Sequence, residues 1–381
     1  MFFKGMMDLV QSLGTISIEV YEWNQDDVRK KRLPNASKLH SLSTKHPDLL
    51  FSGCRLAHAV VKADYLDRRN LTMPGLGFLL QACSIMDFGK SPIELKSGAA
   101  KALNDFSLSS MAGRVGQGLA ILYGHRLGLK FAAHLRSHVE SLPAGSAGAV
   151  HKNEAMADFL FATSQQTVII ESKGSFSLQE NDPSPIKKVL KAALQDQVDP
   201  WMRHLQPTPS NGYVIYSCLR EGSSEPSAMF VVDPEGDPVE SANVPLSVEQ
   251  VMRENYGAWL RAMGMVNSAE RLLHPLPDVR SPVEYGFFIA EIRGRKYAYP
   301  DQSYSWFSPY RRWCTPLIGI DFFVLQAISS VIQSRSTSLQ DLLANFHEAS
   351  EFSHRGASVF PDGSIFGLID EHPIHHVQIA L

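Results

Sequence analysis

The 381-residue chain has few cysteines and no excess of basic residues. Its four cysteines lie far apart and form no C-x-x-C pair, which argues against a zinc knuckle and against a disulfide scaffold. The 36 basic and 39 acidic side chains give a formal charge of −3, which excludes a globally basic protein that coats nucleic acid but not a local basic cleft. No apolar run reaches the ~20 residues of a membrane span. Residues 1–14 lack the features of a signal peptide, so we expect a cytoplasmic protein with no membrane partner.

The length favours two or three domains, and changes in pattern divide the chain into three regions. We expect an N-terminal region of unknown role over 1–105, a core that carries the chemistry over 106–240, and a C-terminal α+β region over 241–381 that binds substrate or a partner. The spacing of apolar residues and turn formers predicts one broken helix or two helices over 110–141, weakened in the middle by Gly124 and Gly128. It also predicts a hairpin over 157–171, a helix over 184–199, strands over 213–219 and 228–232, and a hairpin turn at 361–363.

Charged side chains gather on the predicted hairpin. Glu171 and Lys173 are two residues apart on one strand, so their side chains point to the same face of the sheet. With the turn centred near Gln165, antiparallel pairing brings Asp158 opposite residue 172, within one position. Burying two carboxylates is unfavourable unless a cation compensates their charge. Carboxylate oxygens are suitable ligands for Mg²⁺, so this pattern indicates a metal site.

This arrangement resembles the core of the PD-(D/E)XK, or restriction-endonuclease-like, nuclease superfamily, in which an Asp on one strand precedes Glu-x-Lys on the next, between helices. The resemblance covers residues 110–235, with Ala157 in place of the usual Pro. It implies an α/β (mixed α+β) fold: a mixed sheet flanked by helices, with N- and C-terminal additions. It also implies that Asp158, Glu171 and the backbone carbonyl of Ser172 hold Mg²⁺ or Mn²⁺, and that Lys173 assists the attacking water.

The helices beside the hairpin supply possible supporting residues. In many members of the superfamily the helix after the motif carries a Lys or Gln that faces the site, and here Lys188, Lys191 and Gln195 share one helical face. The preceding helix has no Glu at the expected place. Gln117 has suitable chemistry for that place, and Glu154 is a more distant alternative.

One candidate for nucleic-acid binding lies within residues 106–139, which contain no acidic residue. Arg126, Lys130, His134 and His138 follow at steps of four, which would form one ridge of a helix. Such a ridge could follow a phosphate backbone. The alternative is an ordinary solvated helix face.

A second candidate lies within residues 293–313, where basic and aromatic residues alternate. The basic members are Arg293, Arg295, Lys296, Arg311 and Arg312. Aromatic side chains that stack on bases, next to cations that hold phosphates, are typical of single-strand binding. The alternative is a strand and loop whose aromatic side chains are buried.

The leading hypothesis is therefore a Mg²⁺-dependent nuclease, a hydrolase of phosphodiester bonds, with DNA as the expected substrate. Large regions on both sides of the core are typical of an antiviral defence or mobile-element effector. The alternative is a nuclease-fold binding or assembly protein that acts with a protein partner or as a homo-oligomer, without catalysis. Geometry discriminates these hypotheses. Catalysis requires the Asp158 and Glu171 carboxylates to point into one cleft close to Lys173, and an Asp158 that faces away favours the binding protein. A closed cleft would favour a third alternative, a structural scaffold without a site.

Overall fold

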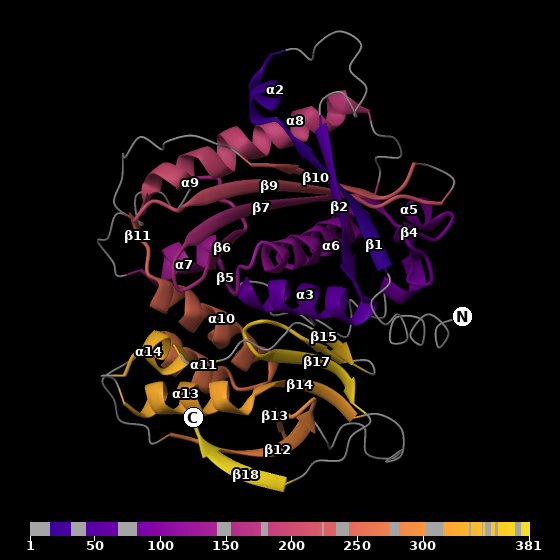
Figure 1. Ribbon diagram of the computed structural model, residues 1–381. Coiled ribbons are helices and arrows are strands. Elements are labelled where there is room, and N and C mark those ends of the chain that lie inside the picture. Colours follow the sequence, from indigo (N-terminus) through magenta and orange to yellow (C-terminus); the bar gives the residue numbers. More distant parts are fainter. Residues whose placement is uncertain are drawn as a thin grey trace.

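The computed structural model describes residues 16–31, 43–67, 82–142, 154–176, 182–222, 225–233, 244–274, 282–301, 315–334, 337–344, 346, 352–354, 357–369 and 375–381. Two seven-stranded sheets dominate this part of the chain, and each has helices packed against it (Figure 1). The sheet with the predicted hairpin lies above the sheet of the C-terminal region in this view, with helices α3 (Gly53–Leu66) and α10 (Val248–Ala262) between them.

The first sheet is mixed, with the strand order β2-β1-β10-β9-β7-β6-β5. Parallel pairing joins β1 to β10 and β7 to β9, and the other neighbours are antiparallel. Its strands are β1 (Ile16–Trp23), β2 (Ser43–Phe51), β5 (Phe131–His134), β6 (Phe159–Ala162), β7 (Thr167–Ser175), β9 (Asn211–Cys218) and β10 (Ala228–Val232). The mixed sheet of an α/β protein is thus confirmed, and the N-terminal region contributes β1 and β2 to it.

Helices cover both faces of this sheet. The helices α3 and α6 (Asp105–Arg126) pack on the face that carries Phe161 and Ile170. The opposite face, with Val214 of β9, packs against α8 (Pro183–Ala193), the π-helix η3 (Leu194–Val198) and α9 (Asp199–His204). The predicted helix over 184–199 therefore begins one residue earlier, where the Asp182 carboxylate accepts a hydrogen bond from the Ser184 amide at 3.0 Å.

The predicted helix over 110–141 is two helices separated by a strand. Helix α6 ends at Arg126, and Gly128, with a φ of +81°, reverses the chain direction where a side chain would be strained. The chain then forms β5 and the short helix α7 (Leu135–Ser141). The expected ridge of basic and histidine side chains along one helix is therefore wrong, because Lys130 lies in the turn and His134 in the strand.

The second sheet has the order β15-β16-β17-β14-β13-β12-β18 and is antiparallel throughout. Its strands are β12 (Glu284–Ile292), β13 (Arg295–Pro300), β14 (Thr315–Asp321), β15 (Phe352–His354), β16 (Ala357–Val359), β17 (Ser364–Ile369) and β18 (His375–Ala380). The helices packed with it are α10, α11 (Val266–Leu273), α13 (Phe322–Gln333) and α14 (Leu339–Leu343). The predicted hairpin turn at 361–363 joins β16 to β17 and is confirmed.

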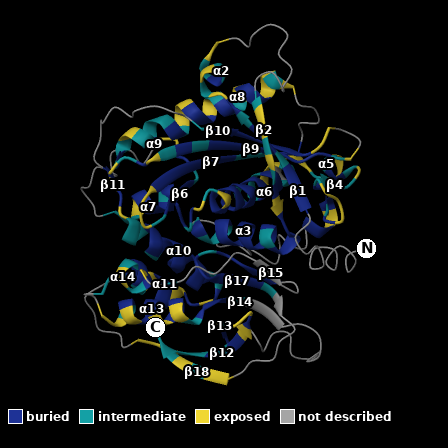
Figure 2. Ribbon diagram, viewed as in Figure 1, coloured by how far each residue is buried: buried dark blue, intermediate teal, exposed yellow. Residues whose placement is uncertain are grey.

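Shorter elements complete the described chain. They are α2 (Gln25–Arg29), β3 (Met86–Asp87), β4 (Glu94–Leu95), α5 (Ala99–Ala102), β8 (Leu205–Gln206) and β11 (Val244–Pro245). None of the helices in the described ranges is long and apolar enough to cross a bilayer. Figure 2 shows that buried residues are continuous from the first sheet through α3 and α10 to the second.

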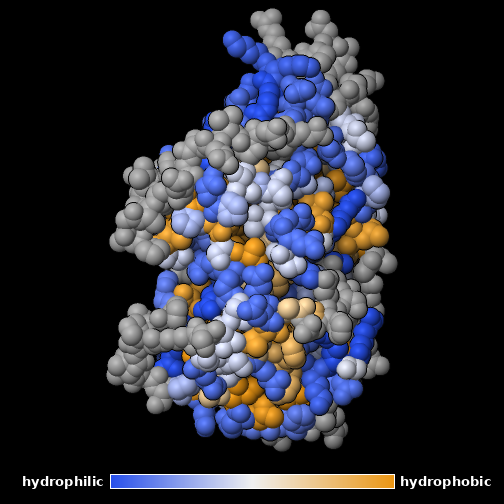
Figure 3. Space-filling view, turned by 60° about the vertical axis from the view of Figure 1, so that its left-hand side comes forward, coloured by the Kyte–Doolittle hydropathy of each residue, from blue (hydrophilic) through white to orange (hydrophobic). Residues whose placement is uncertain are grey.

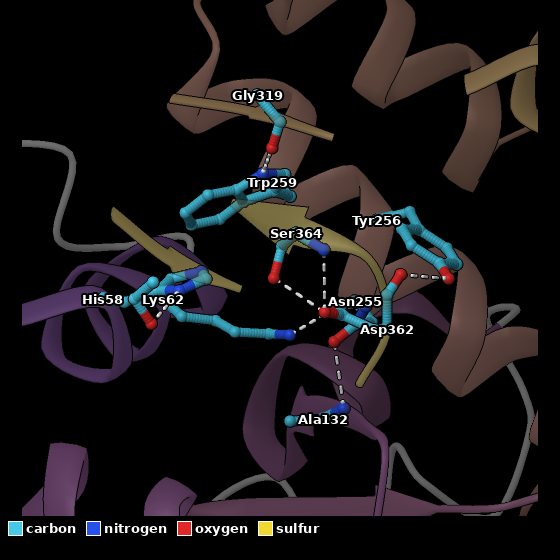
Figure 4. Close-up of polar contacts among 10 residues, drawn as sticks. His58, Lys62, Ala132, Asn255, Tyr256, Trp259, Gly319, Asp362 and Ser364 are labelled. Atoms are coloured by element: carbon cyan, nitrogen blue, oxygen red, sulfur yellow. Dashed lines mark hydrogen bonds and ion pairs between the residues drawn. The ribbon is translucent and has the colours of Figure 1, made fainter. Parts of the chain in front are cut away.

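A buried polar network joins the two sheets (Figure 4). Lys62 of α3 forms an ion pair with Asp362 in the β16–β17 turn, and both side chains are fully buried. Asn255 of α10 donates to the Asp362 carboxylate at 2.7 Å and accepts from the Ala132 amide of β5 at 3.1 Å. Burial opposes ionisation of Asp362, but Lys62 and Asn255 hold its pKa well below the usual range. The C-terminal region is thus attached to the first sheet through a buried charge.

Candidate functional site

The register of the β6–β7 hairpin brings the two predicted acids face to face. Phe159 pairs with Ile170, so Asp158, just before β6, lies across from Glu171. The sequence predicted residue 172 within one position, and the observed partner falls inside that range. The parallel pairing of Glu171 with Val214 of β9 also places Glu171 and Lys173 on the face covered by α8, η3 and α9.

Reciprocal hydrogen bonds fix the acid pair. The Asp158 backbone amide donates to Glu171 Oε2 at 3.0 Å, and the Ser172 amide donates to Asp158 Oδ2 at 3.2 Å. Lys173 Nζ forms an ion pair with Glu171 Oε1. The Glu171 side chain is fully buried, whereas that of Lys173 is 38% exposed, so the lysine connects the buried acid to solvent. Asp158, Glu171 and Lys173 thus lie together at one end of the hairpin.

The electrostatics of the pair favour a bound proton or cation. Burial, followed by the negative charge of Asp158, raises the pKa of Glu171 to about 8. Burial also raises the pKa of Asp158 to about 6, against the opposing effects of Lys173 and the Ser172 amide. The two carboxyls titrate as a coupled pair, so near neutral pH the metal-free pair retains a proton. A divalent cation at the same position would replace that proton.

Gln117 of α6, the helix that covers the other face of the sheet, contacts Asp158. Its side chain hydrogen-bonds to Asp158 and helps to lower the pKa of that carboxyl. The alternative at this position, Glu154, is exposed and pairs with His204 Nε2 at 3.0 Å. Gln117 therefore occupies the place beside the acids where the resemblance expects a Glu.

Two glycines allow α6 to lie close enough to β7 for this contact. A Cβ atom at Gly174 would lie 1.9 Å from the carbonyl oxygen of Ala112, which no real structure tolerates. A Cβ atom at Gly116 would lie 3.0 Å from the Lys173 carbonyl oxygen. The backbones of α6 and β7 thus touch immediately after the Glu-Ser-Lys sequence, and this contact sets the reach of Gln117.

The helix after the motif does not supply the expected supporting side chains. Leu190 packs towards the sheet, which turns Lys191 towards α2, where its Nζ donates to the Arg29 carbonyl at 3.0 Å. The expectation that Lys191 supports the site is therefore corrected. Lys188 and Gln195 are exposed, and within the described ranges neither contacts the acid pair.

Two residues that the sequence reasoning missed hold the chain segment just before Asp158. Gln197 Nε2 donates to the Met156 carbonyl at 2.8 Å, and Trp201 Nε1 donates to the Ala155 carbonyl at 2.8 Å. Gln197 lies in the π-helical turn η3, which shifts the helical faces relative to a regular α-helix. Regular α-helical spacing counted from Lys188 therefore predicts that Gln195 faces the site, whereas Gln197 is the residue that contacts the segment before Asp158.

The first basic segment is used within the fold. Arg126 Nη1 donates to the Pro47 carbonyl of β2 at 2.7 Å, and Lys130 is partly buried in the turn after α6. His138 is buried and contacts the Glu254 carboxylate at 3.2 Å. These side chains form no common exposed surface.

The second basic segment is largely structural in its described part. Arg295 pairs with Asp321, with Nη2 and Oδ2 2.8 Å apart. Tyr297 and Tyr299 are buried, as expected for the alternative in which the aromatic side chains of this segment belong to the core. Lys296 is exposed. Arg311 and Arg312 lie outside the described residues.

The donors at the acid pair suit a hard divalent cation. Two carboxylates and the Ser172 carbonyl are oxygen ligands of the kind that Mg²⁺ and Mn²⁺ bind, and the remaining positions of such an ion are commonly filled by water. Within the described ranges, no three Asp, Glu, His or Cys side chains are grouped as a ready metal-binding set. Comparison with family models, with curated proteins and with solved structures finds no match.

Proposed function

We propose that this protein is a Mg²⁺- or Mn²⁺-dependent nuclease whose active site contains Asp158, Glu171 and Lys173. The observation that carries the proposal is the buried acid pair with a lysine on its solvent side. Two carboxylates with raised pKa values are held together by hydrogen bonds although this arrangement opposes their ionisation. Such an arrangement is expected where a cation is to be bound.

The order of the surrounding elements supports the same proposal. Along the chain, α6 is followed by the antiparallel strands β5, β6 and β7, with the short helix α7 between β5 and β6. The helical segment from α8 to α9 and the short strand β8 then lead to β9, which is parallel to β7. Together they form part of a mixed sheet between two helix layers, with Glu171 on β7 and Asp158 directly before β6. This is consistent with the resemblance to restriction-endonuclease-like nucleases.

Each residue then has a chemical role. Asp158, Glu171 and the Ser172 carbonyl would hold the cation, which when bound provides Lewis acidity and lowers the pKa of a coordinated water. Lys173 can leave Glu171 once the cation neutralises it, and its ammonium then stabilises charge on the attacked phosphate. Gln117 fixes the orientation of Asp158 through its hydrogen bond.

The test is cleavage of supercoiled plasmid, linear duplex DNA, single-stranded DNA and RNA, with Mg²⁺, Mn²⁺ or EDTA. We expect cleavage that requires the cation and that falls about 10³-fold or more in Asp158→Asn and Glu171→Gln. Glu154→Gln is the matched control, because this nearby acid is exposed and pairs with His204 instead. Full activity in both site variants refutes the proposal. Cation-independent binding without cleavage of any substrate would favour the binding-protein alternative.

A further inference from the structure

Helices α2 and α8 together carry a concentration of basic side chains on the first sheet's outer layer. The two helices pack through the apolar side chains Val28, Ile186 and Leu190. The basic residues of α8 and of α2 with the two residues after it are Arg29, Lys30, Lys31, Lys187, Lys188 and Lys191, of which Lys187 is buried. A hydrophilic surface is visible at the level of α2 and α8 near the top of Figure 3.

Two of these six cations are neutralised by carboxylates. Arg29 forms two hydrogen bonds with Asp199, at 2.6 and 3.0 Å, and Lys30 Nζ lies 2.6 Å from Asp27 Oδ1. The four remaining lysines form no ion pair with any described carboxylate. The other described acids here are Asp26 in the first turn of α2 and Asp182 at the N-terminus of α8, so six cations face four carboxylates. Positive charge is therefore in excess here, although the whole chain is slightly acidic.

Two of the unpaired lysines are held close to one another. Lys187 Nζ donates to the Lys30 carbonyl at 2.5 Å, and Lys191 Nζ donates to the Arg29 carbonyl at 3.0 Å. Capping of the C-terminal carbonyls of α2 explains these two contacts. It does not explain the exposed Lys31 and Lys188 beside them, and like charges at this spacing repel unless an anion is bound.

This basic surface lies on the same side of the first sheet as the acid pair. Glu171 and Lys173 point towards the layer formed by α8, η3 and α9, as their pairing with β9 requires. Helix α8 also follows the Glu-Ser-Lys strand directly in the chain. In contrast, Arg126 and Arg295, which were expected to bind nucleic acid, are used by Pro47 and Asp321 within the fold.

We propose that the lysine surface formed by Lys31, just after α2, and by Lys188 and the partly exposed Lys191 of α8 binds the phosphodiester backbone of nucleic acid. The choice of this polyanion rests on the proposed nuclease function. The surface is separate from the two basic segments of the sequence, of which Arg126 and Arg295 contact Pro47 and Asp321 within the fold. Its role is binding and is separate from the bond-breaking step at Asp158 and Glu171.

The test compares two charge-matched double variants of the full chain. Lys31→Gln with Lys188→Gln removes two exposed lysines of the surface, and Lys90→Gln with Lys101→Gln removes two exposed lysines elsewhere. Affinity is measured by fluorescence anisotropy in EDTA, which prevents cation-dependent cleavage, over a series of salt concentrations. Duplex DNA, duplex RNA and single-stranded DNA are separate arms, because all three carry the same phosphodiester chemistry.

We expect the surface variant to weaken binding about tenfold at low salt. The negative slope of log K against log salt concentration should become shallower by about two, because two phosphate contacts are lost. The control variant should change affinity less than about twofold. Equal losses in both variants, unchanged affinity in the surface variant, or no binding of any nucleic acid by the natural protein would each overturn the inference. Cleavage assays in Mg²⁺ are scored separately. If the natural protein cleaves nucleic acid but the surface variant binds it with unchanged affinity, only the surface proposal is refuted. If the surface variant loses affinity but the natural protein cleaves no substrate, only the nuclease proposal is refuted.

Discussion

Replacing Glu171 with Gln should stabilise the metal-free protein, and the gain should grow with pH. The folded state raises the pKa of Glu171 from 4.5 to about 8, mainly through burial and then through the charge of Asp158. The folded state therefore binds the proton more tightly than the unfolded state, and stability is lost as pH rises from the unfolded value towards the folded one. At pH 8 this linkage corresponds to at most about 4 kcal/mol, and the loss is complete only at higher pH.

Glutamine keeps an oxygen that can accept from the Asp158 amide, but its NH₂ group cannot pair with Lys173. Because Lys173 is partly exposed, it can turn to solvent at little cost. We therefore expect a gain of about 2–3 kcal/mol at pH 8 and close to zero at pH 4.5. The assay is urea denaturation in EDTA across this pH range, with the exposed Glu291→Gln as control. A difference that is independent of pH, or that favours the natural protein at pH 8, refutes the electrostatic reasoning.

Three further predictions concern single residues. Lys173→Ala should lower the single-turnover cleavage rate in Mg²⁺ about 10²–10³-fold, while affinity for duplex DNA measured in Ca²⁺ changes little; equal losses in both would make Lys173 a phosphate anchor. Lys62→Met should lower the free energy of unfolding by about 3–5 kcal/mol in urea, because it leaves Asp362 buried without its cation, and adding Asp362→Leu should recover part of the loss; no recovery would contradict this. Gly174→Ala should separate α6 from β7 and lower Mn²⁺ affinity in calorimetry, and an unchanged affinity would show that the backbone contact with Ala112 does not set the site.

The sequence predicted those parts of the site that depend on local pattern. The hairpin follows from two apolar runs around a polar turn, and its period of two fixes which side chains share a face. Asp158, Glu171 and Lys173 therefore meet as predicted. Gln117 was also found, because only one residue with suitable chemistry stands at that place on the preceding helix.

What the sequence did not predict depends on local departures from regular geometry and on tertiary contacts. The turn at Gly128 interrupts the helical period, so side chains expected on one ridge lie on different elements. The π-helical turn selects Gln197 over Gln195 as the residue that contacts the segment before Asp158. The use of Arg126 and Arg295 inside the fold depends on distant partners in the chain, which periodicity does not reveal.

The most direct test of the site is calorimetric titration of the protein with Mn²⁺ at pH 7 in buffers of different ionisation enthalpy. We expect about one ion to bind per chain with the release of about one proton, because the metal-free acid pair retains a proton at this pH. Binding should be lost in Asp158→Asn and Glu171→Gln and kept in Glu154→Gln. Binding of Mn²⁺ that is unaffected by both site variants, or no binding by the natural protein, would contradict the assignment of Asp158 and Glu171 as the metal site.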